Sequence, residues 1–158
     1  MKNVIIYTDG ACSGNPGIGG FGVILRFNGN RREISEGFRK TTNNRMELMA
    51  VIAGLETLKE KCSVTLFTDS QYIVNSITRG WARRWREKGW MRNKKEKALN
   101  PDLWDKLLKL CEYHQVEIRW VRGHAGDPEN ERADKLAVEA MRQKDLLIDE
   151  VYENTAAR

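Results

Sequence analysis

The sequence predicts an α/β domain built on a mixed β-sheet, and three observations lead to this expectation. The chain has 158 residues, which suits a single domain with a sizeable core. Near the N-terminus the apolar residues follow the period of β-strands, including two strands of a meander. After this meander, strand patterns alternate with helical patterns, which is typical of an α/β fold.

The first elements along the chain are three strands. Residues 3–10 form a continuous apolar run, which predicts a strand buried on both faces. A turn-rich loop, "SGNPGIGG", is expected next. The segments "FGVILRF" and "REISEGF" alternate well enough to form two strands, with "NGN" as their hairpin turn. From Asn43 to Lys59 the apolar residues recur with the period of a helix.

The remaining elements alternate between strands and helices. "SVTLFT" predicts a strand, and short helices are expected at about 70–77 and 81–87. "NPDLWDKLLKLCEYH" begins with a capping Asn and has Pro101 at the first helical position. "VEIRWV" predicts the last strand and "DPENERADKLAVEAMRQ" the last helix. We expect residues 1–142 to form one domain and residues 143–158 to be a polar, loosely attached tail.

The composition excludes several classes of protein. No segment approaches the roughly 20 apolar residues of a membrane span. The apolar run before Asp9 is too short for a signal peptide. The three cysteines are widely spaced and form no C-x-x-C pair, which argues for free thiols and against structural zinc. We therefore expect a cytoplasmic protein.

The positive charge is concentrated in the basic segment, residues 79–97. Its sequence, "RGWARRWREKGWMRNKKEK", holds nine Lys or Arg residues against two Glu, an excess larger than the net charge of +5 of the whole chain. Trp81, Trp85 and Trp90 are interleaved with these cations. Aromatic side chains among cations are typical of nucleic-acid grooves, so we expect nucleic-acid contact here. The alternative is that Trp81 and Trp85, one helical turn apart, belong to the core.

Gly17, Gly19 and Gly22 match the dinucleotide-binding pattern G-x-G-x-x-G. That motif works only where a helix begins and directs its N-terminus at a pyrophosphate. The residues that follow here are strand-like. We therefore expect no nucleotide cofactor, and a tight loop instead.

Four acidic residues occupy unusual positions. Asp9 and Asp69 each follow a Thr at the end of an apolar strand, and the connection between them contains a helix. Such a crossover normally makes the two strands parallel neighbours, with both acids at the carboxyl edge of the sheet. Glu47 and Asp134 each border the apolar face of a helix. The alternative for these two is a favourable contact with a helix dipole.

A cluster of carboxylates requires compensating charge. Two of them about 4 Å apart repel by about 4 kcal/mol at an effective dielectric constant of 20. Oxygen ligands without nearby Cys or paired His select hard ions, so we expect Mg²⁺ or Mn²⁺. Beside a basic and aromatic segment, such a metal site indicates hydrolysis of phosphodiesters.

Four motifs resemble those of bacterial ribonuclease HI, in the type 1 ribonuclease H family: "YTDGACSGNPG", "TTNNRMEL", "FTDSQY" and "HAGDPENERAD". The resemblance extends from Met1 to about Met141. It implies a five-stranded sheet in the order 3-2-1-4-5 with strand 2 antiparallel, helices on both faces, and a basic protrusion at about 79–98. It also implies endonucleolytic cleavage of RNA in RNA–DNA hybrids, with 5′-phosphate and 3′-hydroxyl ends, by a monomer that needs no small-molecule cofactor.

The resemblance also implies the roles of individual residues. The metal-binding acids would be Asp9, Glu47, Asp69 and Asp134, with Asp9 shared between two Mg²⁺ ions when substrate is bound. His124 would assist proton transfer or product release. The RNA 2′-hydroxyls would face Asn43, Asn44 and Gln71, with the Cys12 loop nearby. A phosphate of the DNA strand would be held by Asn15, Thr42 and Arg45. The basic protrusion would grip the DNA strand through Trp81, Trp85, Lys88 and Trp90.

Two other functions remain open from the residues. A related nuclease of the integrase or resolvase type could use similar acids on DNA. A hybrid-binding module without catalysis is the second alternative, although clustered acids would repel the phosphates that such a module has to bind. Activity on an RNA–DNA hybrid but not on duplex DNA would distinguish these possibilities.

Overall fold

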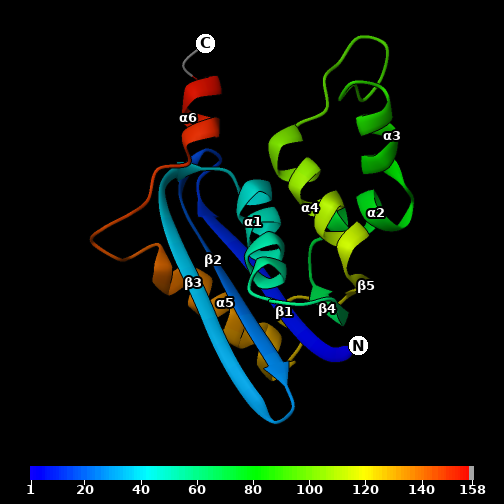
Figure 1. Ribbon diagram of the computed structural model, residues 1–158. Helices are drawn as coiled ribbons and strands as arrows, with labels where there is room; N and C mark the ends of the chain where they lie inside the picture. Colours follow the sequence, from blue (N-terminus) through cyan, green and yellow to red (C-terminus); the bar gives the residue numbers. More distant parts are fainter. Residues whose placement is uncertain (157–158) are drawn as a thin grey trace.

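The computed structural model describes residues 1–156, and a five-stranded mixed sheet forms its centre (Figure 1). The strands lie in the order β3-β2-β1-β4-β5. β2 is antiparallel to β1 and β3, whereas β1, β4 and β5 are parallel. The predicted order and directions are therefore confirmed. The strands are β1 (Lys2–Ser13), β2 (Gly17–Phe27), β3 (Asn30–Thr41), β4 (Cys62–Thr68) and β5 (Gln115–Trp120).

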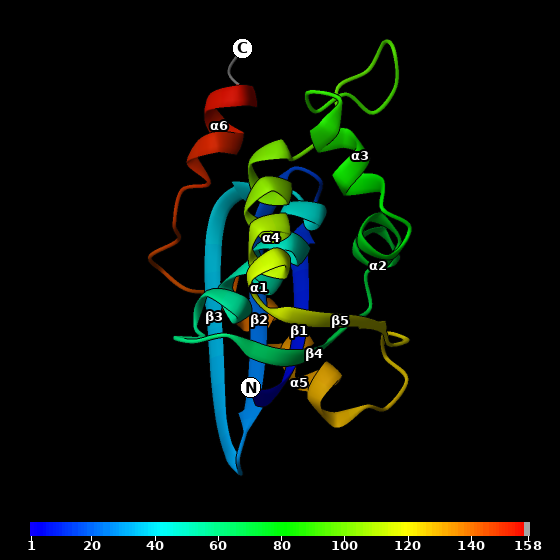
Figure 2. The same ribbon diagram turned by 45° about the vertical axis from the view of Figure 1, so that its right-hand side comes forward.

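Helices cover both faces of this sheet, as expected (Figure 2). On one face α1 (Asn43–Glu56) packs on β1 and β2, and α4 (Pro101–Tyr113) packs on α1. On the other face α5 (Pro128–Ala140) crosses β1, β2 and β3. The short helices α2 (Gln71–Thr78) and α3 (Trp81–Glu87) lie beside α4. Among residues 1–156, no helix combines the length and apolar character needed to cross a membrane.

The first half of β1 is buried on one face only, so the expectation of two-sided burial is wrong there. Val4 and Ile6 are buried against α1, whereas Ile5 is 40% exposed. Ile5 borders an open groove beside Pro128, the first residue of α5. The helix therefore starts too late along the sheet to cover this end of the strand.

The glycine-rich segment contributes to a strand rather than to a long loop. Only residues 14–16 separate β1 from β2, so Gly17, Gly19 and Gly22 all lie in β2. The dinucleotide-binding pattern thus leads into a strand, as the sequence indicated. A Cβ on Gly22 would lie 2.3 Å from the carbonyl oxygen of Ala133 in α5. Glycine at this position allows the helix to pack directly on the sheet.

The C-terminal segment is attached to the edge of the sheet. Leu147 exchanges backbone hydrogen bonds with β3, to Gly37 at 2.8 Å and from Arg39 at 2.9 Å. Asp149 is 3% exposed and precedes α6 (Glu150–Ala156), which lies beside β3 (Figure 1). The expectation of a loosely attached tail is therefore wrong for residues 143–156, and residues 157–158 lie outside the described part. The boundary at residue 142 stays a prediction.

Candidate active site

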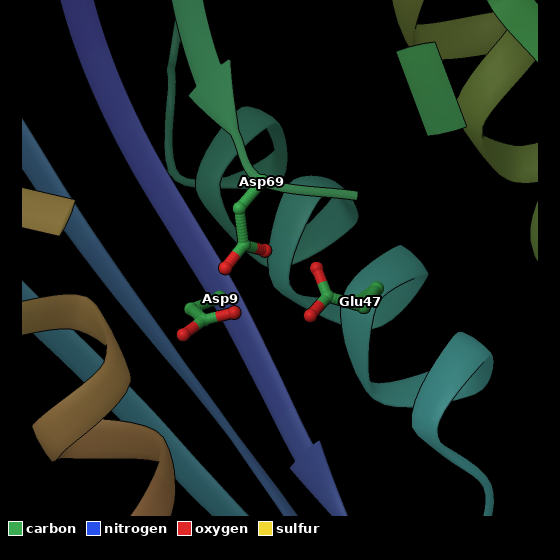
Figure 3. Close-up of side chains that lie close together, drawn as sticks. All are labelled: Asp9, Glu47 and Asp69. Carbon is green, nitrogen blue, oxygen red and sulfur yellow. The ribbon is translucent and has the colours of Figure 1, made fainter. Parts of the chain in front are cut away.

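The register of the two central parallel strands brings Asp9 and Asp69 together. Tyr7 of β1 pairs with Phe67 of β4, and their rings stack at 4.8 Å. Side chains alternate between the faces of a strand, so residues two positions further along return to the same face. Asp9 and Asp69 occupy these positions. Asp69 directly follows β4, as expected, whereas Asp9 lies within β1, which continues along β2 to Ser13 instead of ending near the acid. Figure 3 shows their carboxylates turned toward each other.

Glu47 reaches the same point from α1, whose first turns pack directly against β1. A Cβ on Gly10 would lie 2.5 Å from the backbone nitrogen of Glu47, so only glycine permits this contact. The amide of Gly10 donates to both neighbouring carboxylates, to Asp9 Oδ1 at 2.9 Å and to Glu47 Oε1 at 3.0 Å. Oxygen atoms of Asp9, Glu47 and Asp69 lie within 4.8 Å of one another (Figure 3).

The electrostatics of this acidic cluster oppose ionisation. Burial raises the pKa of Asp9 to about 11, and the charges of Glu47 and Asp69 add to the rise. Burial likewise raises the pKa of Glu47 to about 8, with repulsion from Asp69 and Asp134 contributing. Glu47 Oε2 is buried and has no hydrogen-bond partner among the described residues. An unpartnered buried carboxylate oxygen is costly, so it indicates a site that receives a further ligand.

Asp134 and His124 complete the cavity around these acids. The cavity has a volume of about 270 Å³ and is lined mostly by polar side chains from β1, α1, the connection between β4 and α2, the loop before α5, and α5. Asp134 is half-buried on α5, between buried Ala133 and Ala137. His124 is exposed on the loop before α5 and has a positive φ of 58°. The structure therefore brings together all five residues predicted as catalytic, with Asp134 outside the tightest group of three.

Several of the predicted substrate-binding residues lie at the rim of the acidic cavity. Asn43 lines it directly, and exposed Gln71 follows Ser70, another lining residue. The amide of Asn43 donates to Asn15 Oδ1 at 3.1 Å, which ties the loop after β1 to the start of α1. Thr42 is the N-cap of α1. Cys12 is half-buried, with its thiol against the carbonyl oxygens of Gly17 and Thr41.

Arg45 has a different environment from the one predicted, because its guanidinium is buried and fully engaged. It is 3% exposed and donates to Asp149 through Nε and Nη2, at 2.7 and 3.0 Å. It donates to Asp102 through Nη1 and Nη2, at 3.0 and 2.8 Å, and to Asn100 Oδ1 at 3.2 Å. A guanidinium has five N–H donors, so none is left for a phosphate. The expectation that this side chain binds a phosphate directly is therefore wrong. We call Arg45, Asp102, Asp149 and Asn100 the Arg45 network.

Asn100 is the N-cap residue of α4, as expected, but its side chain belongs to this network instead of capping the helix. Its φ of 58° is left-handed, and its side chain forms no hydrogen bond with the start of the helix. Because its oxygen accepts from Arg45, the residue links the protrusion to the α1 start.

Most predicted residues of the basic segment surround a second cavity, of about 560 Å³. Trp81, Trp85 and Lys88 line it together with Asn44. Trp85 also packs edge-on against buried Trp104, with ring centroids 6.0 Å apart. It therefore belongs both to the core and to the cavity of the basic segment, the two interpretations that the sequence left open. Trp90 packs partly against the core and is not among the lining residues.

Two further residues that line this second cavity, Tyr72 and Leu99, lie outside the predicted basic segment. Tyr72 carries the clearest signal, because a phenol directly after Gln71 occupies the next position of the same short helix. Its hydroxyl accepts from Trp104 Nε1 at 3.0 Å, which fixes its orientation. The remaining lining residues, Arg84, Met91 and Arg92, belong to the basic segment, although none of them was predicted as a substrate-binding residue by itself.

Comparisons with known proteins agree with this geometry. A family profile described as RNase H matches residues 1–142. A protein named Ribonuclease H from Desulforamulus reducens is 66% identical over 149 residues, covering 94% of this chain and 94% of that protein. Ribonuclease HI from a Synechocystis strain is 56% identical over 152 residues, covering 96% of this chain and 95% of that protein.

Solved structures show the same fold. LC9-RNase H1, described as a type 1 RNase H with the type 2 active-site motif, superimposes with a TM-score of 0.79 at 38% identity, over 99% of this chain and 82% of its own. LC11-RNase H1, solved in complex with an RNA/DNA hybrid, gives a TM-score of 0.63 at 27% identity. That match covers 87% of this chain and 96% of the other.

Proposed function

The chain belongs to the RNase H family, and on this premise we propose that it hydrolyses the RNA strand of RNA–DNA hybrids. The observation that carries the proposal is the acidic cluster, in which oxygens of Asp9, Glu47 and Asp69 converge within 4.8 Å. Two relatives named ribonuclease H or HI are 66% and 56% identical to this chain over nearly its whole length. A shared activity is therefore the simplest interpretation. The expected products carry 5′-phosphate and 3′-hydroxyl ends.

The residues present fit a divalent metal. The donors are all carboxylate oxygens, which hard ions prefer, and the free oxygen of Glu47 is a ligand without a partner in the protein. We propose that the acids hold Mg²⁺, with Mn²⁺ as a substitute, and that Asp9 is shared between two ions when the hybrid is bound. Asp134 would complete the set from α5. When bound, such ions activate water and stabilise charge on the phosphate oxygens.

The protein's own groups orient the reaction around this centre. The Gly10 amide holds the Asp9 and Glu47 carboxylates in place. His124 lines the cavity from an exposed loop, so its imidazole is able to approach a departing oxygen and deliver a proton, or to assist product release. The burial of Asp9 and Glu47 limits the water around the reacting phosphate.

Recognition of the hybrid would use the two sides of the site. Asn43, Asn44 and Gln71 would face the 2′-hydroxyls of the RNA strand, with the Cys12 loop beside them. The DNA strand would follow the basic segment through Trp81, Trp85 and Lys88, with Trp90 supporting it. Asn15 and Thr42 would contact a DNA phosphate. Arg45 would act indirectly, because its donors hold the start of α1 to neighbouring segments.

We also propose that the protein is a cytoplasmic monomer. All five predicted catalytic residues come from one chain, so a second copy is not needed to complete the cavity. The three cysteines are free, which suits a reducing compartment. Light scattering at micromolar concentration would test the monomer, for which a mass near 18.2 kDa is expected.

The test of function is cleavage of an end-labelled RNA–DNA hybrid, with duplex DNA and single-stranded RNA in parallel. We expect cleavage of the RNA strand only in the hybrid, dependent on Mg²⁺ and lost in Asp9→Asn. Cleavage of duplex DNA would favour the integrase-like alternative. Binding of the hybrid by wild-type protein without cleavage, with Mg²⁺ present, would favour the non-catalytic module.

A further inference from the structure

The backbone around Asp69 passes from a strand to a helix within three residues. The carbonyl of Thr68 accepts the last sheet bond, from the amide of Val121 at 2.9 Å. Helix α2 is capped by Ser70, whose carbonyl accepts the first helical bond, from Val74 at 3.1 Å. The carbonyl of Asp69 lies between these two and belongs to neither ladder.

The indole of Trp120 supplies a donor for this carbonyl. Trp120 pairs with Thr68 in the sheet, and its Nε1 donates to Asp69 O at 3.2 Å. The peptide group before the Cα of Asp69 is thus hydrogen-bonded to Val121, and the peptide group after it is hydrogen-bonded to Trp120. Fixing both groups fixes the direction in which the Asp69 side chain leaves the backbone.

The carboxylate itself is contacted by the same segment. A Cβ on Gly123 would lie 2.7 Å from Asp69 Oδ2, so the backbone of Gly123 packs directly against this oxygen. The next residue is His124, which lines the acidic cavity. Residues 120–123 therefore contact Asp69 at two points, its carbonyl and its carboxylate, and hold the Thr68 carbonyl directly before it.

Packing alone does not account for Trp120. Its side chain is 46% exposed, although a large aromatic residue gains most from full burial. We infer that Trp120 is a positioning residue that orients the Asp69 carboxylate for the divalent metal. This role rests on the proposed metal-dependent function. It assigns the end of β5, which carries none of the predicted catalytic residues, to the assembly of the metal site.

Trp120→Phe tests this role, because it keeps an aromatic ring and removes the N–H donor. Calorimetry without hybrid should show Mg²⁺ affinity reduced about 10-fold, as is common when a group that orients a metal ligand is removed. The kcat should fall at limiting Mg²⁺ and recover at high Mg²⁺, whereas the KM for hybrid should stay unchanged. Tyr113→Phe is the matched control, since Tyr113 is also 46% exposed and its variant should bind Mg²⁺ like wild type.

Gly123→Ala perturbs the same carboxylate from the other side and leaves the indole intact. It should weaken Mg²⁺ binding as well. If circular dichroism shows Trp120→Phe to be unfolded, the Mg²⁺ affinity of Gly123→Ala tests whether residues 120–123 position the Asp69 carboxylate, and an unchanged affinity would overturn the inference. Unchanged Mg²⁺ affinity in a folded Trp120→Phe variant would overturn the inference. So would an increased KM for hybrid at unchanged Mg²⁺ affinity, which would make the indole a substrate contact. Failure of the wild-type protein to bind Mg²⁺ or to cleave hybrid would instead refute the proposed function.

Discussion

Replacing Asp9 by Asn should abolish cleavage and at the same time stabilise the metal-free protein. Asp9 is 4% exposed and shares its cavity with Glu47 and Asp69, whose oxygens lie within 4.8 Å. At that distance and an effective dielectric constant of 20, two unit charges repel by about 3 kcal/mol. An amide of the same shape removes this repulsion and still accepts the hydrogen bond from Gly10.

Proton uptake leads to a similar magnitude. The pKa of Asp9 rises from 3.8 to about 11, mainly through burial, so at pH 7 the folded protein holds a proton that the unfolded chain releases. At about 1.4 kcal/mol per pKa unit, the interval from the ordinary pKa of 3.8 to pH 7 corresponds to about 4 kcal/mol of lost stability. We therefore expect Asp9→Asn to gain about 3 kcal/mol in the free energy of unfolding at pH 7.

Urea unfolding in EDTA measures this gain. With an m value of ~2 kcal/mol/M, the midpoint should rise by about 1.5 M. Because the folded pKa values of Asp9 and Glu47 are raised, the contribution of these two acids to metal-free stability is fully present below about pH 4. It falls as pH increases toward about 8 for Glu47 and toward about 11 for Asp9. The advantage of Asp9→Asn should therefore appear above about pH 4 and grow with pH.

Asp145→Asn is the control, because it removes one negative charge at an exposed position. It should leave the midpoint nearly unchanged. An Asp9→Asn variant no more stable than wild type in EDTA, or a gain of the same size at pH 4 and pH 8, would refute the electrostatic explanation. Excess Mg²⁺ should reduce the difference, because bound metal stabilises the wild type.

Three further expectations follow from charges elsewhere in the structure. Asp149→Ala should lower the free energy of unfolding by about 3–5 kcal/mol, measured by thermal unfolding, because it removes the main partner of buried Arg45. The control Asp145→Ala should lower it little. A loss below about 1 kcal/mol in Asp149→Ala would contradict an electrostatic anchor for the tail. Burial lowers the pKa of His114, whose Nδ1 accepts from the Cys62 amide at 3.1 Å, so the contribution of this residue to stability should be full above about pH 6.5 and fall at lower pH. This dependence between pH 7.5 and 5.5 should shrink in His114→Ala, and an equal dependence in both proteins would reject the assignment. Hybrid binding should lose roughly one unit of its salt slope for each phosphate contact removed from the basic segment, and an unchanged slope would exclude contact with the phosphates. The four substitutions to make together, each to Ala, are Arg83, Arg84, Lys94 and Lys95.

The elements of the fold and the acidic cluster could be predicted because their signals are local. Each strand and helix has its own period, and the crossover from β1 to β4 makes Asp9 and Asp69 neighbours whatever the details of the loops. The Asn28-Gly29 turn is equally local, since both residues adopt the positive φ that a tight hairpin requires. The family motifs assigned roles to Glu47, His124 and Asp134, and the packing of α1 and α5 on the sheet brings these residues to the same cavity.

The errors arose where a distant segment decides the outcome. The apolar pattern of β1 does not reveal that α5 starts beyond Ile5, so burial on both faces was expected. A tail rich in charge looks loosely attached until Asp149 is paired with Arg45, 104 positions earlier. Trp120 gave no signal as a positioning residue, because its indole hydrogen bond to the Asp69 carbonyl spans 51 positions.

Arg45 and Glu47 show how one turn of a helix can serve both stability and function. Both side chains are buried on α1, two residues apart, and both would be costly without opposite charge. The protein supplies that charge to Arg45 through Asp102 and Asp149, and every donor of the guanidinium is used. It surrounds Glu47 with further acids and leaves one oxygen without a partner. An ionised Glu47 therefore needs a balancing charge from outside the chain, as the proposed metal would supply, and this is the physical difference between an anchor and a binding site.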